Sequence, residues 1–291
     1  MRLVTYDDGS NVSRVGYVSG DRVVDLGEVI GGYGQPGGPG AMRRLLERWL
    51  DVRDALPGPD DAPSLALGDI HLLAPVPDPT KIVAAPVNYR EHRAEMAMTV
   101  DIHDLAVFLK APSSIIPHGG VVQLPYSDRR VDQEGELAVV IGRRASHVSE
   151  ADALSCVAGY TGCLDITMRG KEDRSTRKSF DTFTPLGPWL VTADEADPAD
   201  DIELECTVGG EHRQKTNTRN LIWSVARLVS YISTVMTLEV GDVIATGTPA
   251  GVGPLTDGDA IELTLSSIGT LAVTVAQAPS AGPSPTGTRE R

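Results

Sequence analysis

The chain has 291 residues, of which 41% are hydrophobic and 4% aromatic, and it carries a formal net charge of −14. A chain of this length can bury one large core or two unequal ones. Its acidity argues against nucleic acid and anionic membrane surfaces as partners, because phosphates select clustered Lys and Arg. No apolar run approaches the ~20 residues of a membrane span, so we also expect no contact with the membrane interior.

Glycine and proline are plentiful, with 30 and 20 copies, which favours a β-rich, turn-rich architecture over a helical bundle. The N-terminus has no apolar block of the signal-peptide type. The three cysteines are odd in number and lack metal-ligand spacing, so they predict reduced thiols and a cytoplasmic location. They are Cys156, Cys163 and Cys206.

The N-terminal segment has the pattern of a small α/β unit. Residues 1–30 predict a β-meander with a turn at Ser19-Gly20-Asp21. The apolar residues of 42–52 recur at helical spacing. Proline-rich stretches follow, and we place the domain boundary near residue 75. This gives an accessory domain over 1–74 and a β-dominated domain over 75–277.

Residues 88–96 contain a candidate acid–base pair. If this segment is helical, His92 and Glu95 are three apart and share a face. A carboxylate that holds an imidazole fixes its tautomer and raises its basicity, as a general base requires. A surface His–Glu pair on a helix is common and is the alternative.

The most informative feature is a pair of glutamates at the start of a strand-like run, residues 134–142. Side chains alternate faces along a strand, so Glu134 and Glu136 point the same way. Ala138 and Val140 continue that face, which indicates that it is buried. Two buried anions repel each other and lose hydration unless a positive charge lies between them. A divalent cation is the simplest explanation, and a solvated strand start at the sheet rim is the alternative.

Asp165 adds a third carboxylate, within a buried-strand pattern at 159–167. Three carboxylates without clustered His or Cys favour a hard ion such as Mg²⁺, with Mn²⁺ or Ca²⁺ as alternatives. Such sites usually leave coordination positions open for water or substrate oxygens.

Two basic residues follow the third carboxylate. Lys178 could balance the charge of the acidic site or bind a substrate carboxylate or oxyanion, and a solvated loop lysine is the alternative. Arg169 comes four residues after Asp165 and could serve the same anion.

The C-terminal part combines a helix, a strand and a glycine-rich loop. Residues 220–236 carry an apolar face at helical spacing. The loop at 246–253 offers backbone amides and the Thr248 hydroxyl, but it lacks the ending of a phosphate-binding P-loop. A tight turn between strands is the alternative. The tail over 278–291 is rich in Pro, Ser and Gly, and we expect it to be disordered.

Six motifs in this order resemble the fumarylacetoacetate hydrolase family. They span roughly residues 80–255, and they are Asn88-Tyr-x-x-His92-x-x-Glu95, Lys110-x-Pro-Ser-Ser114, Glu134-x-Glu136-Leu, Gly159-Tyr-Thr followed by Asp165, Lys178-Ser-Phe-Asp-Thr-Phe-x-Pro-Leu-Gly-Pro188, and Thr246-Gly-Thr-Pro-x-Gly-Val-Gly253. The resemblance implies an α+β, β-rich fold, in which a mixed β-roll or barrel forms the catalytic domain and the N-terminal segment forms a small α/β accessory domain. It also implies a homodimer.

The resemblance assigns a role to each candidate residue. The metal-ligand positions are matched by Glu134, Glu136 and Asp165. The catalytic set is His92 and Glu95, which form the base dyad on a lid, together with Lys178. The substrate-binding set is Tyr89, Arg169 and Thr248.

The implied substrates are 1,3-dicarbonyl or 2-oxo acids that chelate the ion through two oxygens. We expect a metal-dependent hydrolase that cleaves a C–C bond in a small anionic acylpyruvate-type acid through a stabilised enolate, in catabolism of an aromatic compound. The same site would also support decarboxylation or isomerisation of a 2-oxo dicarboxylic acid.

The sequence departs from the family pattern in two places. Gly170 and Glu172 stand where many relatives have Asp and Gln, and 85–87 reads Ala-Pro-Val where glycine is more usual. The first change alters a pocket wall, so the alternative that this chain is a family member that only binds a ligand stays open. The second predicts a stiffer hinge.

Overall fold

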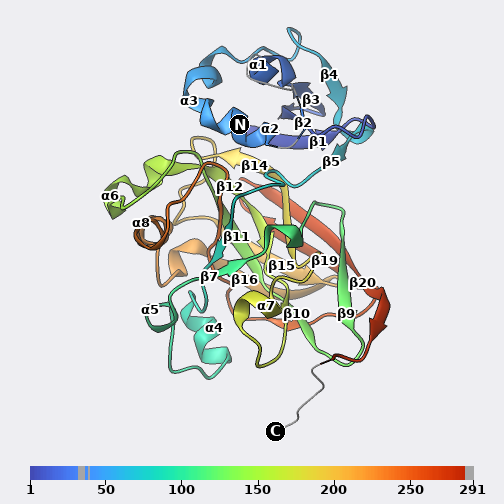
Figure 1. The fold of residues 1–291 in the computed structure, drawn as a ribbon, viewed down its shortest axis with the longest axis vertical. Helices are drawn as coiled ribbons and strands as arrows, with labels where there is room; N and C mark the ends of the chain where they lie inside the picture. Colours follow the sequence, from blue (N-terminus) through green and yellow to red (C-terminus); the bar gives the residue numbers. More distant parts are fainter. Residues whose placement is uncertain (32–36, 39, 286–291) are drawn as a thin grey trace.

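The structure is a computed structural model that describes residues 1–31, 37–38 and 40–285. It has the predicted strand-rich α+β fold, with mixed sheets (Figure 1). No sheet in the described part of the chain closes into a barrel, so of the two expected forms, β-roll or barrel, the closed barrel is absent there. No helix among these residues is long and apolar enough to cross a membrane.

The largest sheet has 12 strands and runs through the whole molecule. Its path is β4 (Ser64–Ala66), β3 (Arg22–Asp25), β2 (Arg14–Ser19), β1 (Arg2–Asp7), β14 (Thr184–Thr192), β12 (Val157–Leu164), β11 (Gly135–Ile141), β17 (Val243–Ala245), β6 (Ile82–Ala84) and β7 (Phe108–Lys110). Two short strands join it from the side, β5 (His71–Leu72) and β8 (Ile115–Ile116).

Two smaller sheets complete the β-structure. One contains β13 (Thr167–Met168), β10 (Val131–Gln133) and β18 (Gly253–Pro254). The other contains β16 (Glu211–Asn217), β15 (Glu203–Val208), β19 (Ala260–Leu265), β20 (Gly269–Gly282) and β9 (Val121–Tyr126).

The helices are short. They are α1 (Gly27–Gly31), α2 (Ala41–Glu47), α3 (Trp49–Val52), α4 (Arg90–Glu95), α5 (Ile102–Leu105), α6 (Glu150–Ala153), α7 (Arg174–Arg177) and α8 (Val225–Val235). The helix expected over 42–52 is therefore present as α2 and α3, with an interruption at Arg48.

The N-terminal elements lie together at one end of the molecule, coloured blue in Figure 1. The predicted meander is confirmed, because β1, β2 and β3 pair in antiparallel order. Strand β1 also pairs with β14, through Leu3 and Leu190. The main-chain hydrogen bonding of the sheet thus crosses residue 75, and the division of the chain into two domains at that position stays a prediction.

The helix expected over 220–236 begins later than predicted. Residues Thr218–Asn220 form a 3₁₀ turn, and the helix proper, α8, starts only after Ser224. The Ser224 hydroxyl accepts a hydrogen bond from the Arg227 N–H at 3.2 Å and so caps the first turn. The apolar face is as expected, since Val225, Leu228, Val229 and Ile232 pack into the main core.

The prediction that disorder begins at Ala278 is wrong. Strand β20 continues to Gly282, which pairs with Tyr126 of β9. Beyond the strand, the Ser284 N–H donates to Asp128 Oδ1 at 2.7 Å. A partner strand can order a segment whose composition alone suggests disorder. Residues 286–291 of the expected tail lie outside the described residues.

The sheet order brings distant segments to one place. Strand β11 lies between β12 and β17, and both run antiparallel to it. The start of β11 therefore lies beside the ends of its two neighbours. Glu134 and Glu136 lie at that start, Asp165 directly follows β12, and the loop at 246–253 follows β17. The fold gathers three predicted motif segments at a single edge.

One buried side chain ties this edge to the rest of the domain, and its role was not anticipated. The Asn88 amide donates to the carbonyl oxygens of Trp223 and Thr246, at 3.0 and 2.8 Å. Its Oδ1 accepts from the Trp223 N–H at 2.7 Å. Asn88 is fully buried, so no water can replace these bonds if the side chain is removed.

We therefore predict that Asn88→Ala lowers the free energy of unfolding by about 2–4 kcal/mol, since three backbone groups lose their partner in a buried place. Denaturant unfolding followed by circular dichroism measures the change. The matched control is Asn220→Ala, at an exposed asparagine with one long hydrogen bond to Thr216. Equal effects of the two substitutions would contradict the role given to Asn88.

Candidate active site

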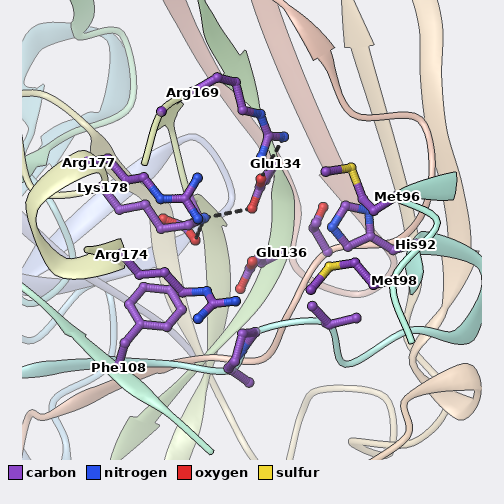
Figure 2. Close-up of a pocket in the computed structure, with 16 residues that line it drawn as sticks. His92, Met96, Met98, Phe108, Glu134, Glu136, Arg169, Arg174, Arg177 and Lys178 are labelled. Atoms are coloured by element: carbon purple, nitrogen blue, oxygen red, sulfur yellow. Dashed lines mark hydrogen bonds and ion pairs between the residues drawn. The ribbon is translucent and has the colours of Figure 1, made fainter. Parts of the chain in front are cut away.

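A cavity of about 330 Å³ lies at the edge where β11 begins (Figure 2). This volume is at the lower end of the roughly 300–1,000 Å³ typical of small-molecule sites. The predicted residues His92, Glu134, Glu136, Asp165 and Lys178 line it. Two further predicted residues, Arg169 and Thr248, also line it. The structure thus brings most of the candidate residues together around one small space.

The three predicted carboxylates converge inside this cavity. Glu134, Glu136 and Asp165 each offer one oxygen, and these oxygens all lie within 4.8 Å of one another. All three side chains are buried. The alternative of a solvated strand start is therefore wrong, and the three carboxylates form a group that could hold a metal ion.

Lys178 compensates two of the three negative charges. Its ammonium donates to Glu134 Oε2 and Thr167 Oγ1, both at 2.7 Å, and it also contacts Asp165 Oδ2. An ammonium has three hydrogens, so each of them already has a protein acceptor. This geometry favours the role of charge balance over direct contact with substrate. The catalytic assignment of Lys178 stays a prediction.

Lys110 provides a second compensating charge. Its ammonium contacts Asp165 Oδ1 and donates to the carbonyl oxygen of Phe183 at 3.0 Å. The side chain is almost fully buried. Sequence reasoning quoted Lys110 within a family motif but assigned it no role. The only signal in the sequence is the place of this lysine in the Lys110-x-Pro-Ser-Ser114 motif, and nothing there indicates that it reaches Asp165.

Glu134 and Glu136 differ in electrostatic environment. Burial opposes ionisation of Glu134, but the positive charges of Lys178 and Arg169 outweigh it and hold its pKa below the usual value. Burial raises the pKa of Glu136 well above its usual value, and the negative charges of Asp165 and Glu134 add to this effect. No basic side chain in the described ranges pairs with Glu136, which accepts only the Gly247 N–H at 2.8 Å.

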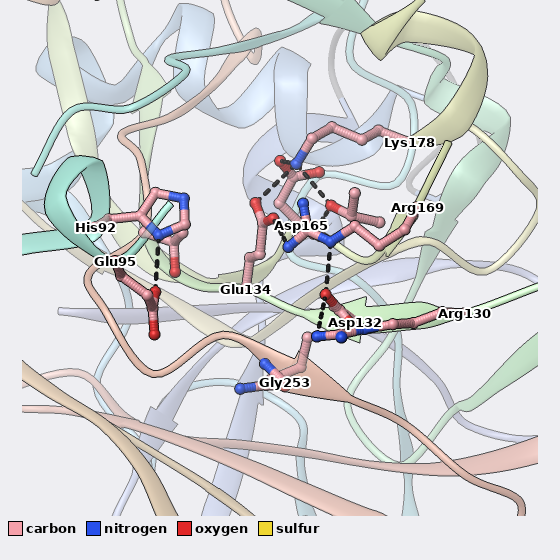
Figure 3. A network of polar contacts seen from close by, with 12 residues as sticks. His92, Glu95, Arg130, Asp132, Glu134, Asp165, Arg169, Lys178 and Gly253 are labelled. Carbon is pink, nitrogen blue, oxygen red and sulfur yellow. Dashed lines mark hydrogen bonds and ion pairs between the residues drawn. The ribbon is translucent and has the colours of Figure 1, made fainter. Parts of the chain in front are cut away.

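Arg169 belongs to a chain of ion pairs that reaches the protein surface (Figure 3). Its guanidinium donates to Glu134 Oε1 at 3.1 Å and to Asp132 Oδ2 at 2.5 Å. Arg130 holds the other side of Asp132, at 2.6 Å. Asp132 is fully buried and was not anticipated from the sequence. Asp132 positions Arg169 so that its guanidinium contacts Glu134 and lines the cavity.

The predicted His–Glu pair is present on α4. His92 Nδ1 lies 3.2 Å from Glu95 Oε2, and His92 also lines the cavity. Glu95 Oε1 accepts the Gly251 N–H at 2.8 Å, which anchors the carboxylate to the glycine-rich loop. An ionised Glu95 favours a proton on Nδ1, and that tautomer leaves the Nε2 lone pair free.

Thr248 and Tyr89 differ in how well their positions suit substrate binding. Thr248 lines the cavity, and its hydroxyl donates to Gly135 O at 3.0 Å and accepts from Gln214 Nε2 at 2.7 Å. Tyr89 is not among the described residues that line the cavity. Its buried hydroxyl has no hydrogen-bond partner in the described ranges, and burial, followed by the negative charge of Glu136, raises its pKa. Its assignment to substrate therefore lacks geometric support.

The altered segment at 170–177 contributes cations to the cavity wall. Glu172 points elsewhere, since it pairs with Arg129 through three contacts of 3.0 Å. Arg174 and Arg177, both on α7, line the cavity instead. Burial, and then the like charge of Arg174, lower the pKa of Arg177. Sequence reasoning identified the altered segment but not the two arginines.

The Ala-Pro-Val segment at 85–87 forms another part of the wall. Val87 has a φ of 50°, in the left-handed region that favours glycine. A β-branched residue in that region stores strain of about 1–3 kcal/mol, and such strain concentrates at functional sites. The stiffer hinge expected for this segment stays a prediction.

Comparison with known proteins agrees with the motifs. Residues 81–276, about two thirds of the chain, match the family model for the C-terminal region of fumarylacetoacetate (FAA) hydrolase. The chain belongs to the fumarylacetoacetate hydrolase family. Its predicted resemblance to this family is therefore confirmed.

Several relatives in the family have a described activity. A maleylpyruvate hydrolase of Aquipseudomonas alcaligenes is 41% identical over 281 residues, which cover 91% of this chain and 97% of that protein. A crystal structure of maleylpyruvate hydrolase from Sphingobium sp. SYK-6, in complex with manganese(II) and pyruvate, superposes with a TM-score of 0.85 at 36% identity. It covers 96% of this chain and 100% of that one. An oxaloacetate tautomerase of Bacillus subtilis is 40% identical over 221 residues, 71% of this chain and 73% of that protein.

We predict that Mn²⁺ or Mg²⁺ raises the melting temperature of the metal-free protein and that Glu136→Gln removes this increase. Without added metal, the variant should be at least as stable as the unmodified chain, because it lacks a buried carboxylate with no cationic partner. Differential scanning fluorimetry with and without chelator measures both effects. The control is Glu262→Gln, at an exposed strand position. A full metal response in the Glu136→Gln protein would contradict the site.

Metal binding should also release protons. Since the pKa of Glu136 is raised, part of the metal-free population carries a proton that the ion must displace. The apparent affinity should therefore fall as the pH is lowered through that raised pKa and level off above it. Isothermal titration calorimetry in two buffers of different ionisation enthalpy counts the released protons. Unchanged affinity across this pH range would contradict the raised pKa.

Proposed function

We propose that this chain is a divalent-metal-dependent hydrolase that cleaves an acylpyruvate into a carboxylic acid and pyruvate. The observation that carries the proposal is the buried group of Glu134, Glu136 and Asp165 in one cavity with the His92–Glu95 pair. The two maleylpyruvate hydrolases among the relatives support this reaction class.

The residues present suit a divalent cation. Glu134, Glu136 and Asp165 would hold it, because three carboxylates offer the oxygen ligands that Mg²⁺ and Mn²⁺ prefer. The unpaired carboxylate of Glu136 supports the same assignment. The manganese in the Sphingobium structure favours Mn²⁺, while Mg²⁺ and Ca²⁺ remain candidates. When bound, the ion would polarise the oxygens of a 2-oxo acid and favour the negative charge that develops on them.

His92 supplies the proton transfer in this proposal. Its Nε2 takes a proton from a water molecule, whose oxygen forms a bond to the acyl carbonyl carbon. The bond between that carbon and C3 of the pyruvate part then breaks, and the electron pair and a proton end on C3. Glu95 keeps the imidazole in the required tautomer and stabilises its protonated form. One water is consumed, and one carboxylic acid and one pyruvate are released.

Two other outcomes of the same site remain alternatives. The tautomerase relative supports keto–enol isomerisation, which moves a proton without taking up water. Decarboxylation of a 2-oxo dicarboxylic acid would release CO₂. A family member that only binds a ligand is disfavoured, because ligand binding alone does not require a general base such as His92 held by Glu95. Product analysis separates these outcomes.

Several finer expectations belong to the same proposal. A role in the catabolism of an aromatic compound follows from the maleylpyruvate hydrolases. The expected homodimer and the cytoplasmic location stay predictions. The three cysteines are free thiols and buried, in keeping with the reduced state expected from the sequence.

We predict that His92→Ala lowers kcat for acylpyruvate hydrolysis by about 10²–10⁴-fold, the usual contribution of a general base, while the protein still responds to metal. Glu95→Gln should lose less, because the imidazole stays in place but its tautomer is no longer held. Pyruvate release, followed with lactate dehydrogenase and NADH, measures the rate. If the His92→Ala protein turned over substrate at the wild-type rate, His92 would not be the general base. Turnover of no acylpyruvate with any divalent ion would refute the proposed function.

A further inference from the structure

The wall of the cavity opposite His92 carries two arginines that the proposed chemistry does not use. Arg174 and Arg177 are three residues apart on α7, so they share one side of its single turn. Figure 2 shows Arg174 beside Phe108 and Arg177 beside Lys178, with Glu136 between them and His92. Both arginines line the cavity.

Neither arginine has an acidic partner among the described residues. This distinguishes them from Arg169, which Asp132 and Glu134 hold from two sides. The buried Nε of Arg177 has no hydrogen-bond acceptor within the part of the chain that the structure describes. A guanidinium that has lost part of its hydration gains most from a carboxylate or phosphate, which it can bind through two parallel hydrogen bonds.

The charges around the cluster of three carboxylates already suffice for a substrate with one negative charge. Such a substrate would not need Arg174 and Arg177. Lys110, Lys178, Arg169 and Arg130 already face the three carboxylates and Asp132, so four positive charges balance four negative ones. With a divalent ion added, this centre has enough positive charge for one carboxylate and one developing oxyanion. Arg174 and Arg177 therefore match a further negative charge on the substrate.

We infer that Arg174 and Arg177 are the residues of this chain that bind a second carboxylate, at the far end of the acyl group, and so select dianionic acylpyruvates, the class to which maleylpyruvate belongs. This inference rests on the proposed function and assigns its specificity to the segment that departs from the family pattern. Phe108, Met96 and Met98 line the same cavity and can contact the apolar carbons between the two acidic ends.

The test compares two ligands that differ only in the second carboxylate. They are 2-oxoheptanedioate and 2-oxoheptanoate, which share a chain length and a 2-oxo acid end and lack the 1,3-dicarbonyl group that is cleaved. Isothermal titration of the manganese-loaded full chain should show about 10- to 100-fold tighter binding of the diacid. Arg174→Gln and Arg177→Gln should each reduce this preference, and the double variant should bring it close to one.

Arg144→Gln is the matched control, because Arg144 is exposed and pairs only with Glu239 on the surface. It should keep the full preference for the diacid. Equal affinity of the unmodified chain for both ligands overturns the inference. A double variant that retains the preference overturns it as well. An equal loss for both ligands would place the arginines at the shared 2-oxo end and would also overturn it.

Binding and turnover separate the two proposals, because neither ligand is cleaved. A chain that hydrolyses acylpyruvates without preferring the diacid refutes only the second-carboxylate site. A chain that prefers the diacid through Arg174 and Arg177 but cleaves no acylpyruvate refutes only the proposed function.

Discussion

Mutual repulsion among three buried carboxylates is the constraint on which the rest of the site depends. Glu134, Glu136 and Asp165 lie close together out of water, and each must meet a positive charge or a donor. Two lysines and Arg169 form ion pairs with Glu134 and Asp165, and the positions of these cations follow from the need to compensate buried negative charge. Among the described residues, Glu136 has only the Gly247 N–H as a donor. A cation placed beside it would complete the balance, so the electrostatics and the proposed chemistry require the same ion.

The sheet order makes this arrangement possible. Antiparallel neighbours of β11 bring their ends to its start, so residues far apart in sequence become ligands or walls of one cavity. Buried amides then fix the loops. Asn88 connects Trp223, just before α8, to Thr246, just after β17. Gln214 of β16 is hydrogen-bonded to the Thr248 hydroxyl and to the Gly135 N–H. Glu95 of α4 is held by the same glycine-rich loop through Gly251.

Local periodicity was enough to predict part of the site. The alternation of side chains placed Glu134 and Glu136 on one face, and the spacing of three placed His92 beside Glu95. The contacts of Lys110 with Asp165 and of Asp132 with Arg169 join segments far apart in sequence, so no local pattern reveals them. Two errors have different causes, since the cap of α8 is a local contact that the apolar spacing does not locate, whereas the pairing of β20 joins distant segments. The start of α8 depends on Ser224 as a cap, and the order of residues 278–282 depends on pairing with β9.

Anomalous diffraction at the manganese edge, from crystals grown with Mn²⁺, most directly tests whether one ion unites this site. We expect a single strong peak per chain, bounded by oxygens of Glu134, Glu136 and Asp165, with Lys178 still bonded to Glu134 and open coordination positions facing His92. An absent peak at these carboxylates, or manganese bound only elsewhere on the chain, would contradict the central claim.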